Sequence, residues 1–169
     1  MRSPLIIFCG VPGSGKTTIA RIVCESIRGS VHVQTDTMRG MIARPSYSGP
    51  ESAFVYDSSV EVARKALQRG RAAILDGTFA RRSHRARALS ELRGLYGKCV
   101  VVRILCSIEC AERRNRARTG VVVPEERLRG IYASFDEPFR AIRINTELHP
   151  PEESAKIILS AVSRSNIPS

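Results

Sequence analysis

The sequence has little aromatic content and no long hydrophobic run. The first feature limits the composition of the core, and the second excludes classes of membrane protein. Phe, Tyr and Trp make up 5% of the 169 residues, with no Trp at all, so we expect a core of Val, Ile, Leu and Ala. No apolar stretch approaches the roughly 18 residues of a transmembrane helix. The basic and then apolar start of the chain is too short for a signal peptide and lacks a cleavage site. We therefore expect a cytoplasmic protein with no membrane partner.

The cysteines are few and form no recognisable pattern. The five of them include no C-x-x-C pair, and the three histidines are scattered along the chain. Zinc sites and disulfide frameworks need such spacings, so we expect neither. The interpretation that remains is a set of buried thiols, at Cys9, Cys24, Cys99, Cys106 and Cys110.

Lysine is the scarce cation in a strongly basic chain. The formal net charge is +11, and of 27 basic residues only four are lysines, at positions 16, 65, 98 and 156. Guanidinium groups bind phosphates through two parallel hydrogen bonds, so the arginines indicate anionic partners. A compositional bias toward arginine explains the same numbers, and the sequence leaves both interpretations open.

The length of 169 residues, with 43% hydrophobic and 25% charged residues, is typical of a globular protein with one hydrophobic core. Short β-branched runs alternate with segments of helical period. We expect strands over 5–9, 31–34, 72–75, 100–105 and 141–144, and we interpret 100–105 as fully apolar. We expect helices over 16–27, 35–42, 51–68, 81–95, 125–135 and 152–162, and one that Ser107 caps and that ends near Arg118. This alternation predicts a single α/β domain over 1–169 with a doubly wound parallel sheet.

A glycine-rich segment follows the first predicted strand. Residues 10–18 read Gly-Val-Pro-Gly-Ser-Gly-Lys-Thr-Thr, which fits the phosphate-binding loop (P-loop) motif G-x-x-x-x-G-K-[ST] between a strand and a helix. Glycines let backbone N–H groups converge on phosphate oxygens. We expect Lys16 to reach the β- and γ-phosphates of ATP and Thr17 to bind Mg²⁺. The nucleotide-binding set is Gly13, Ser14, Gly15, Lys16, Thr17 and Thr18.

A carboxylate and an arginine follow the second predicted strand. Asp36 lies at the carboxyl end of strand 31–34, where doubly wound folds bind ligands, and Arg39 follows on the same helical face. An aspartate there can accept the proton of an attacking hydroxyl, and the arginine can hold an anionic acceptor. Asp36 is also a favoured helix N-cap, and one residue can do both.

A second carboxylate follows the third predicted strand. Asp76, in the sequence Leu-Asp-Gly-Thr, is expected at the same edge of the sheet, where a water bound to Mg²⁺ would lie. A capping or turn aspartate is the alternative. With Thr17, Asp76 forms the candidate metal site. Four arginines follow on the next predicted helix: Arg81, Arg82, Arg85 and Arg87.

An arginine pair precedes an expected break at Gly120. Arg114 and Arg118 are four residues apart, hence on one face of a helix. Such a pair suits a mobile lid, here roughly residues 113–127, that closes over phosphates. The two guanidinium groups would neutralise charge that develops during phosphoryl transfer.

In combination these motifs resemble the small P-loop kinases. The motifs are Gly13–Thr18, Thr35-Asp36-x-x-Arg39, Asp76-x-Thr78 followed by Arg85, and Arg114-Asn115-x-x-Arg118. Within that group the chain is most similar to the polynucleotide 5′-hydroxyl kinases and the seryl-tRNA(Sec) kinases. The segment 113–138 looks particularly like the lid of the seryl-tRNA kinases and the helix after it.

The resemblance implies a P-loop NTPase fold with five parallel strands in the order 2-3-1-4-5 and an arginine-bearing lid. It implies that Asp36 is a general base and that Arg39 contacts a phosphate of the acceptor. Arg85 matches a family arginine to which we assign no role. Three cations would stabilise the transition state: Lys16, Arg114 and Arg118.

Three hypotheses for the function follow. The first is an ATP- and Mg²⁺-dependent phosphotransferase that acts on a hydroxyl of RNA, tRNA or a polynucleotide end, which the basic runs 81–87 and 113–118 favour. The second is a small-metabolite kinase. It is supported by a resemblance of the chain's end to adenylylsulfate kinases, although Asp76-Gly77-Thr78-Phe79 replaces that family's acceptor motif. The third is a nucleotide-dependent tRNA-binding or assembly factor without transfer activity.

Overall fold

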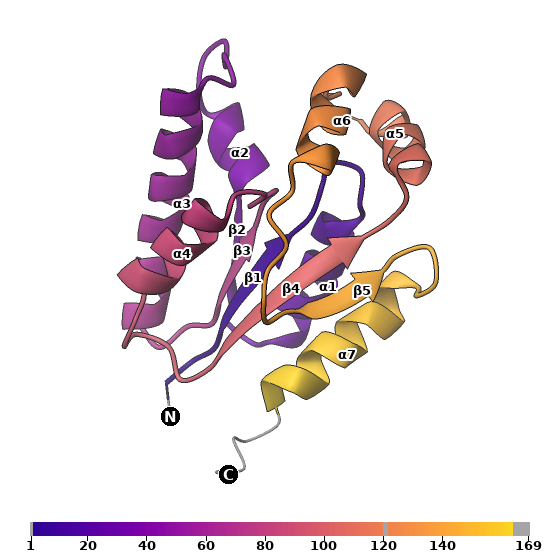
Figure 1. The fold of residues 1–169 in the computed structure, drawn as a ribbon. Coiled ribbons are helices and arrows are strands. Elements are labelled where there is room, and N and C mark those ends of the chain that lie inside the picture. Colours follow the sequence, from indigo (N-terminus) through magenta and orange to yellow (C-terminus); the bar gives the residue numbers. More distant parts are fainter. Residues whose placement is uncertain (1, 120–121, 164–169) are drawn as a thin grey trace.

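A computed structural model describes residues 2–119 and 122–163. Its centre is a parallel sheet of five strands in the order β2-β3-β1-β4-β5 (Figure 1). The strands are β1 (Leu5–Cys9), β2 (Val31–Gln34), β3 (Ala73–Asp76), β4 (Cys99–Leu105) and β5 (Ile142–Asn145). The fold class and the strand order that the sequence predicts are confirmed.

Helices pack against both faces of the sheet. The helices of the described chain are α1 (Lys16–Ser26), α2 (Thr35–Gly40), α3 (Gly49–Gln68), α4 (Arg82–Glu91), α5 (Ile108–Ala117), α6 (Glu125–Ala133) and α7 (Pro151–Ser163). Alternate residues of β1 point to opposite faces of the sheet. Leu5 and Ile7 pack with α3 and α4 on one face, whereas Ile6 and Phe8 pack with α1 and α7 on the other. This period of two is typical of a strand that is buried on both faces.

A third apolar cluster joins α5 and α6 to the loop after β1. Val11 packs there with Cys110 and Ala111 of α5 and with Leu128 of α6. The backbone of Gly13 has a φ of 79°, and a Cβ at this position would lie 2.2 Å from the carbonyl oxygen of Ala111. Only glycine permits this close approach. Both helices therefore lie beyond the carboxyl ends of the central strands, directly above the glycine-rich loop (Figure 1).

Helix α5 begins as predicted and ends one residue early. The hydroxyl of Ser107 accepts a hydrogen bond from the backbone N–H of Cys110 at 3.2 Å, which confirms the predicted N-cap. Arg118 is already extended, with φ −74° and ψ 144°. The expectation that Arg114 and Arg118 share one helical face is therefore wrong, although the site below brings both to one cavity. Gly120, the expected break, lies outside the described residues.

The expectation of a fully apolar fourth strand is wrong, because β4 contains Arg103. Its side chain is buried and donates from Nη2 to Oε1 of Glu137 at 2.8 Å. Its Cζ lies 3.6 Å from the ring centre of Phe135. The guanidinium is accommodated in the interior because a carboxylate and an aromatic face replace its hydration.

The five cysteines are free thiols, of which Cys9, Cys106 and Cys110 are buried. Burial raises the pKa of Cys9 and Cys106 to about 11.

None of the helices in the described ranges combines the length and hydrophobicity that crossing a membrane requires.

Candidate functional site

The loop between β1 and α1 positions five of the six predicted nucleotide-binding residues around an open cavity, whereas the side chain of Ser14 is buried and does not line it. Gly15 adopts a left-handed conformation, with φ 90°, immediately before α1 begins. Nζ of the buried Lys16 donates to the carbonyl oxygen of Val11 at 3.3 Å, while Thr17 and Thr18 are exposed. The cavity, of about 280 Å³, is called the P-loop cavity below. It is lined by Gly13, Gly15, Lys16, Thr17, Thr18, Asp36, Arg114 and Arg118. The N-terminus of α1 adds its N–H groups and positive dipole end to this cradle.

Arg114 is held beside the loop by a residue that the sequence analysis missed. Its Nη1 donates to Oγ1 of Thr146 at 2.7 Å, and its Nη2 donates to the carbonyl oxygen of Thr146 at 3.2 Å. The same Thr146 hydroxyl lies 2.9 Å from the carbonyl oxygen of Ser14. Thr146 directly follows β5, so the rule that ligand-binding residues follow strand ends points to it as well.

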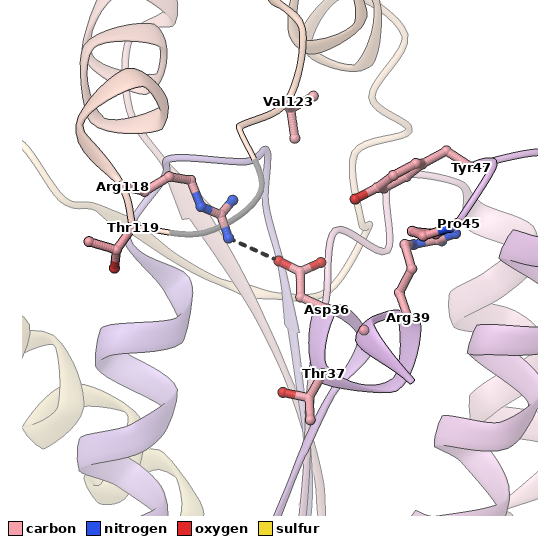
Figure 2. A pocket seen from close by; sticks show the side chains of 9 residues that line it. Asp36, Thr37, Arg39, Pro45, Tyr47, Arg118, Thr119 and Val123 are labelled. Carbon is pink, nitrogen blue, oxygen red and sulfur yellow. Dashed lines mark hydrogen bonds and ion pairs between the residues drawn. The ribbon is translucent and has the colours of Figure 1, made fainter. Parts of the chain in front are cut away.

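Asp36 and Arg118, which both line the P-loop cavity, form an ion pair. Oδ2 of Asp36 accepts a hydrogen bond from Nη2 of Arg118 at 3.3 Å (Figure 2). The Asp36 side chain is 68% exposed, so it is accessible to an acceptor. Asp36 lies inside the first turn of α2 and makes no capping hydrogen bond. The N-cap alternative for this residue is therefore wrong, and the accessible carboxylate remains.

Arg39 lies on the same side of α2 as Asp36, as the spacing predicts (Figure 2). Its guanidinium forms an ion pair with Glu51, and its Nη2 donates to Oγ of Ser52 at 3.3 Å. Its Cζ also lies 4.6 Å from the ring centre of Tyr47. Glu51 thus neutralises Arg39, which leaves Arg39 less charge for an acceptor than the sequence analysis assumed.

Asp76 is buried at the carboxyl edge of the sheet, where it lines a small cavity together with Lys16. Its Oδ2 lies 3.1 Å from Nε2 of His32, whereas its Oδ1 is buried without a hydrogen-bond partner among the described residues. Thr17 lines the same small cavity. A buried carboxylate oxygen that lacks a donor, next to a hydroxyl, fits the oxygen ligands that Mg²⁺ prefers. These residues therefore suit the predicted metal.

A second cavity, of about 230 Å³, opens beside Asp36 and is called the side cavity below. It lies between α2, the start of α4 and α6, and the rings of Tyr47 and Tyr56 form part of its wall. Its charged lining residues are Lys16, Asp36, Arg39, Arg81, Arg118 and Arg127.

The amino-acid sequence matches the model of a known protein family. Residues 5–138 match the model of an AAA domain family, AAA_33. The chain belongs to this family. An uncharacterized protein of Mycobacterium tuberculosis, Rv2004c, is 30% identical over 129 residues, which are 69% of this chain and 26% of that protein. The uncharacterized protein Mb2027c of Mycobacterium bovis gives the same values. The AAA_33 chain thus spans 26% of the length of these curated relatives.

Several solved structures with the same architecture are kinases. The APS kinase CysC of Mycobacterium tuberculosis, in complex with AMPPNP and APS, has a TM-score of 0.76 at 18% identity, over 96% of this chain and 99% of that one. A gluconokinase from Sinorhizobium meliloti 1021 has a TM-score of 0.73 at 17% identity, over 95% and 92% of the two chains. A sugar kinase from Janibacter sp. HTCC2649 has a TM-score of 0.73 at 20% identity, over 98% and 100%. The AAA_33 chain therefore has a P-loop kinase fold.

The role of Arg85 is structural in this AAA_33 chain. It is buried, and its guanidinium donates to the carbonyl oxygens of Phe79, Ala80 and Asp136. Arg85 therefore fastens the segment after α6 to the start of α4. The basic run 81–87, which favoured the RNA hypothesis, therefore does not present Arg85 to an RNA, because it turns one face of α4 inward.

Besides Thr146, sequence reasoning missed Tyr47 and His84, and it did not single out Arg127 within the expected lid segment 113–127. Tyr47, His84 and Arg127 each line the side cavity, yet neither Tyr47 nor His84 belongs to a recognised motif. Tyr47 lies in a loop with a φ of 55°, and Arg127 lies on α6, far along the chain. Their proximity is set by tertiary packing, and no local pattern signals it.

His84 gives the site a pH-dependent stability. Its ring stacks on Tyr56 at a centroid distance of 4.3 Å, and its Nδ1 is buried without a partner among the described residues. Burial, followed by the charge of Arg81, lowers the pKa of His84 below the ordinary 6.5. The unfolded chain therefore takes up this proton more readily than the folded one, and stability falls as the pH drops below 6.5.

We expect His84→Phe to remove this contribution, because Phe keeps the ring but cannot take up a proton. Urea denaturation of the variant and the wild type at several pH values measures the effect. The difference in unfolding free energy should shift in favour of the variant as the pH falls. Ser83→Ala, at a neighbouring exposed position, is the control. Parallel pH curves for His84→Phe and the wild type would contradict the assignment.

Proposed function

We propose that this chain is an ATP-dependent phosphotransferase that moves the γ-phosphoryl group to a hydroxyl of a small molecule. The observation that carries the proposal is the meeting of Lys16, Asp36, Arg114 and Arg118 around the P-loop cavity. Asp36, Lys16 and Arg118 also line the second, side cavity, so the carboxylate and two of the three cations lie at the junction of the two cavities. Nucleotide on one side and acceptor on the other would meet at Asp36.

Each of these side chains has a distinct role in the proposal. Lys16, Arg114 and Arg118 neutralise charge on the phosphates as it develops during transfer. Asp36 accepts the proton of the acceptor hydroxyl. Its exposed ion pair with Arg118 keeps both groups at the junction of the two cavities. Thr146 acts as a positioning residue, since it holds Arg114 beside Gly15.

Thr17 and Asp76 are the residues that would hold Mg²⁺. The ion supplies additional neutralisation of the nucleotide phosphates when it is bound. His32 fixes the orientation of Asp76 through its contact with Oδ2, which leaves Oδ1 directed away from that partner.

Two observations favour a small acceptor over the RNA acceptor of the first hypothesis. The side cavity has a volume of about 230 Å³, suited to a small molecule. Two of the four arginines in the basic run 81–87 are also engaged within the protein, since Arg85 is buried and Arg87 forms ion pairs with Asp57 and Glu91. The gluconokinase, sugar kinase and APS kinase among the structural relatives support the same choice.

Salt dependence separates the two kinds of acceptor. A protein that neutralises several phosphates of a single strand loses about 0.7 log units of affinity per log unit of salt for each contact. A small acceptor with one or two charges cannot give such a slope. We expect label from γ-labelled ATP to enter a metabolite pool, with an apparent KM that changes little with salt. Transfer into RNA or tRNA with a log–log slope steeper than about −2 would reverse the choice.

A further inference from the structure

The lining of the side cavity is strongly unbalanced in charge. Six charged side chains face it, of which five are cations and one, Asp36, is an anion. The cations come from three helices, from the N-cap of α4 and from the C-cap of α5: Lys16, Arg39, Arg127, Arg81 and Arg118. Because like charges repel, such a convergence costs stability unless each cation has a partner or a ligand supplies one.

Three of these cations are already engaged. Lys16 belongs to the P-loop cavity as well. Arg39 forms an ion pair with Glu51, and Arg118 forms one with Asp36. Two cations remain, Arg81 and Arg127, and neither has a carboxylate partner among the residues that the structure describes.

Arg127 is fixed at the rim of the side cavity and keeps donors free. Its Nη2 donates to the carbonyl oxygen of Tyr47 at 3.2 Å, and its Cζ lies 4.8 Å from the ring centre of the same residue. Arg39 stacks on that ring as well, at 4.6 Å. Tyr47 thus holds Arg127 in place through its ring and backbone, and the remaining N–H groups of the guanidinium are available to a ligand.

Arg81 adds positive charge from another side of the cavity. It is exposed and occupies the N-cap position of α4, a helix of ten residues whose positive dipole end lies there. Arg81 also contributes to the lowered pKa of His84 in the same wall, so His84 is held neutral and adds no competing cation.

We propose that Arg81 and Arg127 form an anion subsite in the side cavity, which binds a carboxylate, sulfate or phosphate group of the acceptor. The inference rests on the proposed function and names the class of its substrate: a small hydroxyl compound that carries an oxyanion. Guanidinium groups bind such oxyanions through two parallel hydrogen bonds. The anion-binding role that the sequence analysis gave to Arg39 thus moves to two residues that have no counter-ion of their own.

Matched acceptor pairs test the proposal by activity. Transfer from γ-labelled ATP is measured on glucose against gluconate and on adenosine against adenosine 5′-phosphate. We expect label only in the anionic member of a pair. Arg81→Ala and Arg127→Ala should each raise its KM about ten-fold or more with kcat nearly unchanged. Arg82→Ala and Arg140→Ala, at exposed arginines outside the cavity lining, are the controls.

A binding measurement makes the test independent of the acceptor's identity. Inorganic sulfate is titrated calorimetrically into protein saturated with ADP, so that the nucleotide occupies the P-loop. Sulfate should bind to the wild type and both controls, and binding should be lost in the Arg81→Ala, Arg127→Ala double variant. Equal sulfate binding by that variant, or equal transfer to the neutral member of a pair, would overturn the subsite. Absence of transfer to every acceptor, with sulfate still bound through these arginines, would instead count against the proposed function.

Discussion

Replacing Lys16 with alanine is expected to reduce phosphoryl transfer severely and leave the fold intact. A donor aimed at charge that develops in the transition state contributes about 2–4 kcal/mol, which would reduce kcat by roughly 30- to 1,000-fold. The side chain lies along the P-loop cavity, and its one hydrogen bond in the described structure goes to the loop itself, at Val11. Its removal therefore opens no hole in the hydrophobic core.

Turnover of γ-labelled ATP and thermal unfolding check the two halves of this prediction. Lys65→Ala, which removes an exposed lysine at the end of α3, is the matched control and should behave as the wild type. Unchanged kcat in Lys16→Ala would remove the P-loop from the mechanism.

Asp36→Asn is expected to reduce turnover by about 10²- to 10⁴-fold with ATP affinity nearly intact, because the amide keeps the shape of the carboxylate but accepts no proton. The fold should be unaffected. The ion pair with Arg118 is exposed, and such pairs contribute little to stability. Asp36 also makes no helix cap whose loss would matter.

Single-turnover kinetics, together with nucleotide titration, measure these two quantities. Asp57→Asn is the matched control, since Asp57 forms a comparably exposed ion pair, with Arg87, outside the cavities. Equal losses in the two variants would show a general effect of removing a surface carboxylate and would rule out Asp36 as the base.

The strands could be predicted because their signals are local, whereas their order was implied by the resemblance to the small P-loop kinases. The unbroken apolar run Leu5–Cys9 is buried on both faces, and the P-loop that follows it fixes where α1 begins. Ser107 caps α5 as its sequence context indicates. The errors arise where tertiary partners decide. From the sequence, the strand with Arg103 is interpreted as fully apolar, and the burial of this arginine depends on Glu137, 34 residues away, and on the ring of Phe135.

In the candidate site, too, some residues could be predicted from local signals and others could not. The strand-end rule found Asp36 and Asp76 because parallel strands bring their carboxyl ends to one edge. It could not separate Arg81 from Arg85, four positions apart on the chain, of which one faces the side cavity and the other is buried against backbone carbonyls. The partner of each arginine is set by the tertiary fold. The arginines without a partner in the fold are the ones that remain available to a ligand.

The central claim, phosphoryl transfer to the hydroxyl of a small molecule, is tested most directly by mass spectrometry of a metabolite extract incubated with the chain and γ-labelled ATP. We predict a small product that has gained one labelled phosphoryl group with the wild type and not with Lys16→Ala. If ATP binds but no labelled small product forms, or if the label is found in the RNA fraction alone, the claim is contradicted.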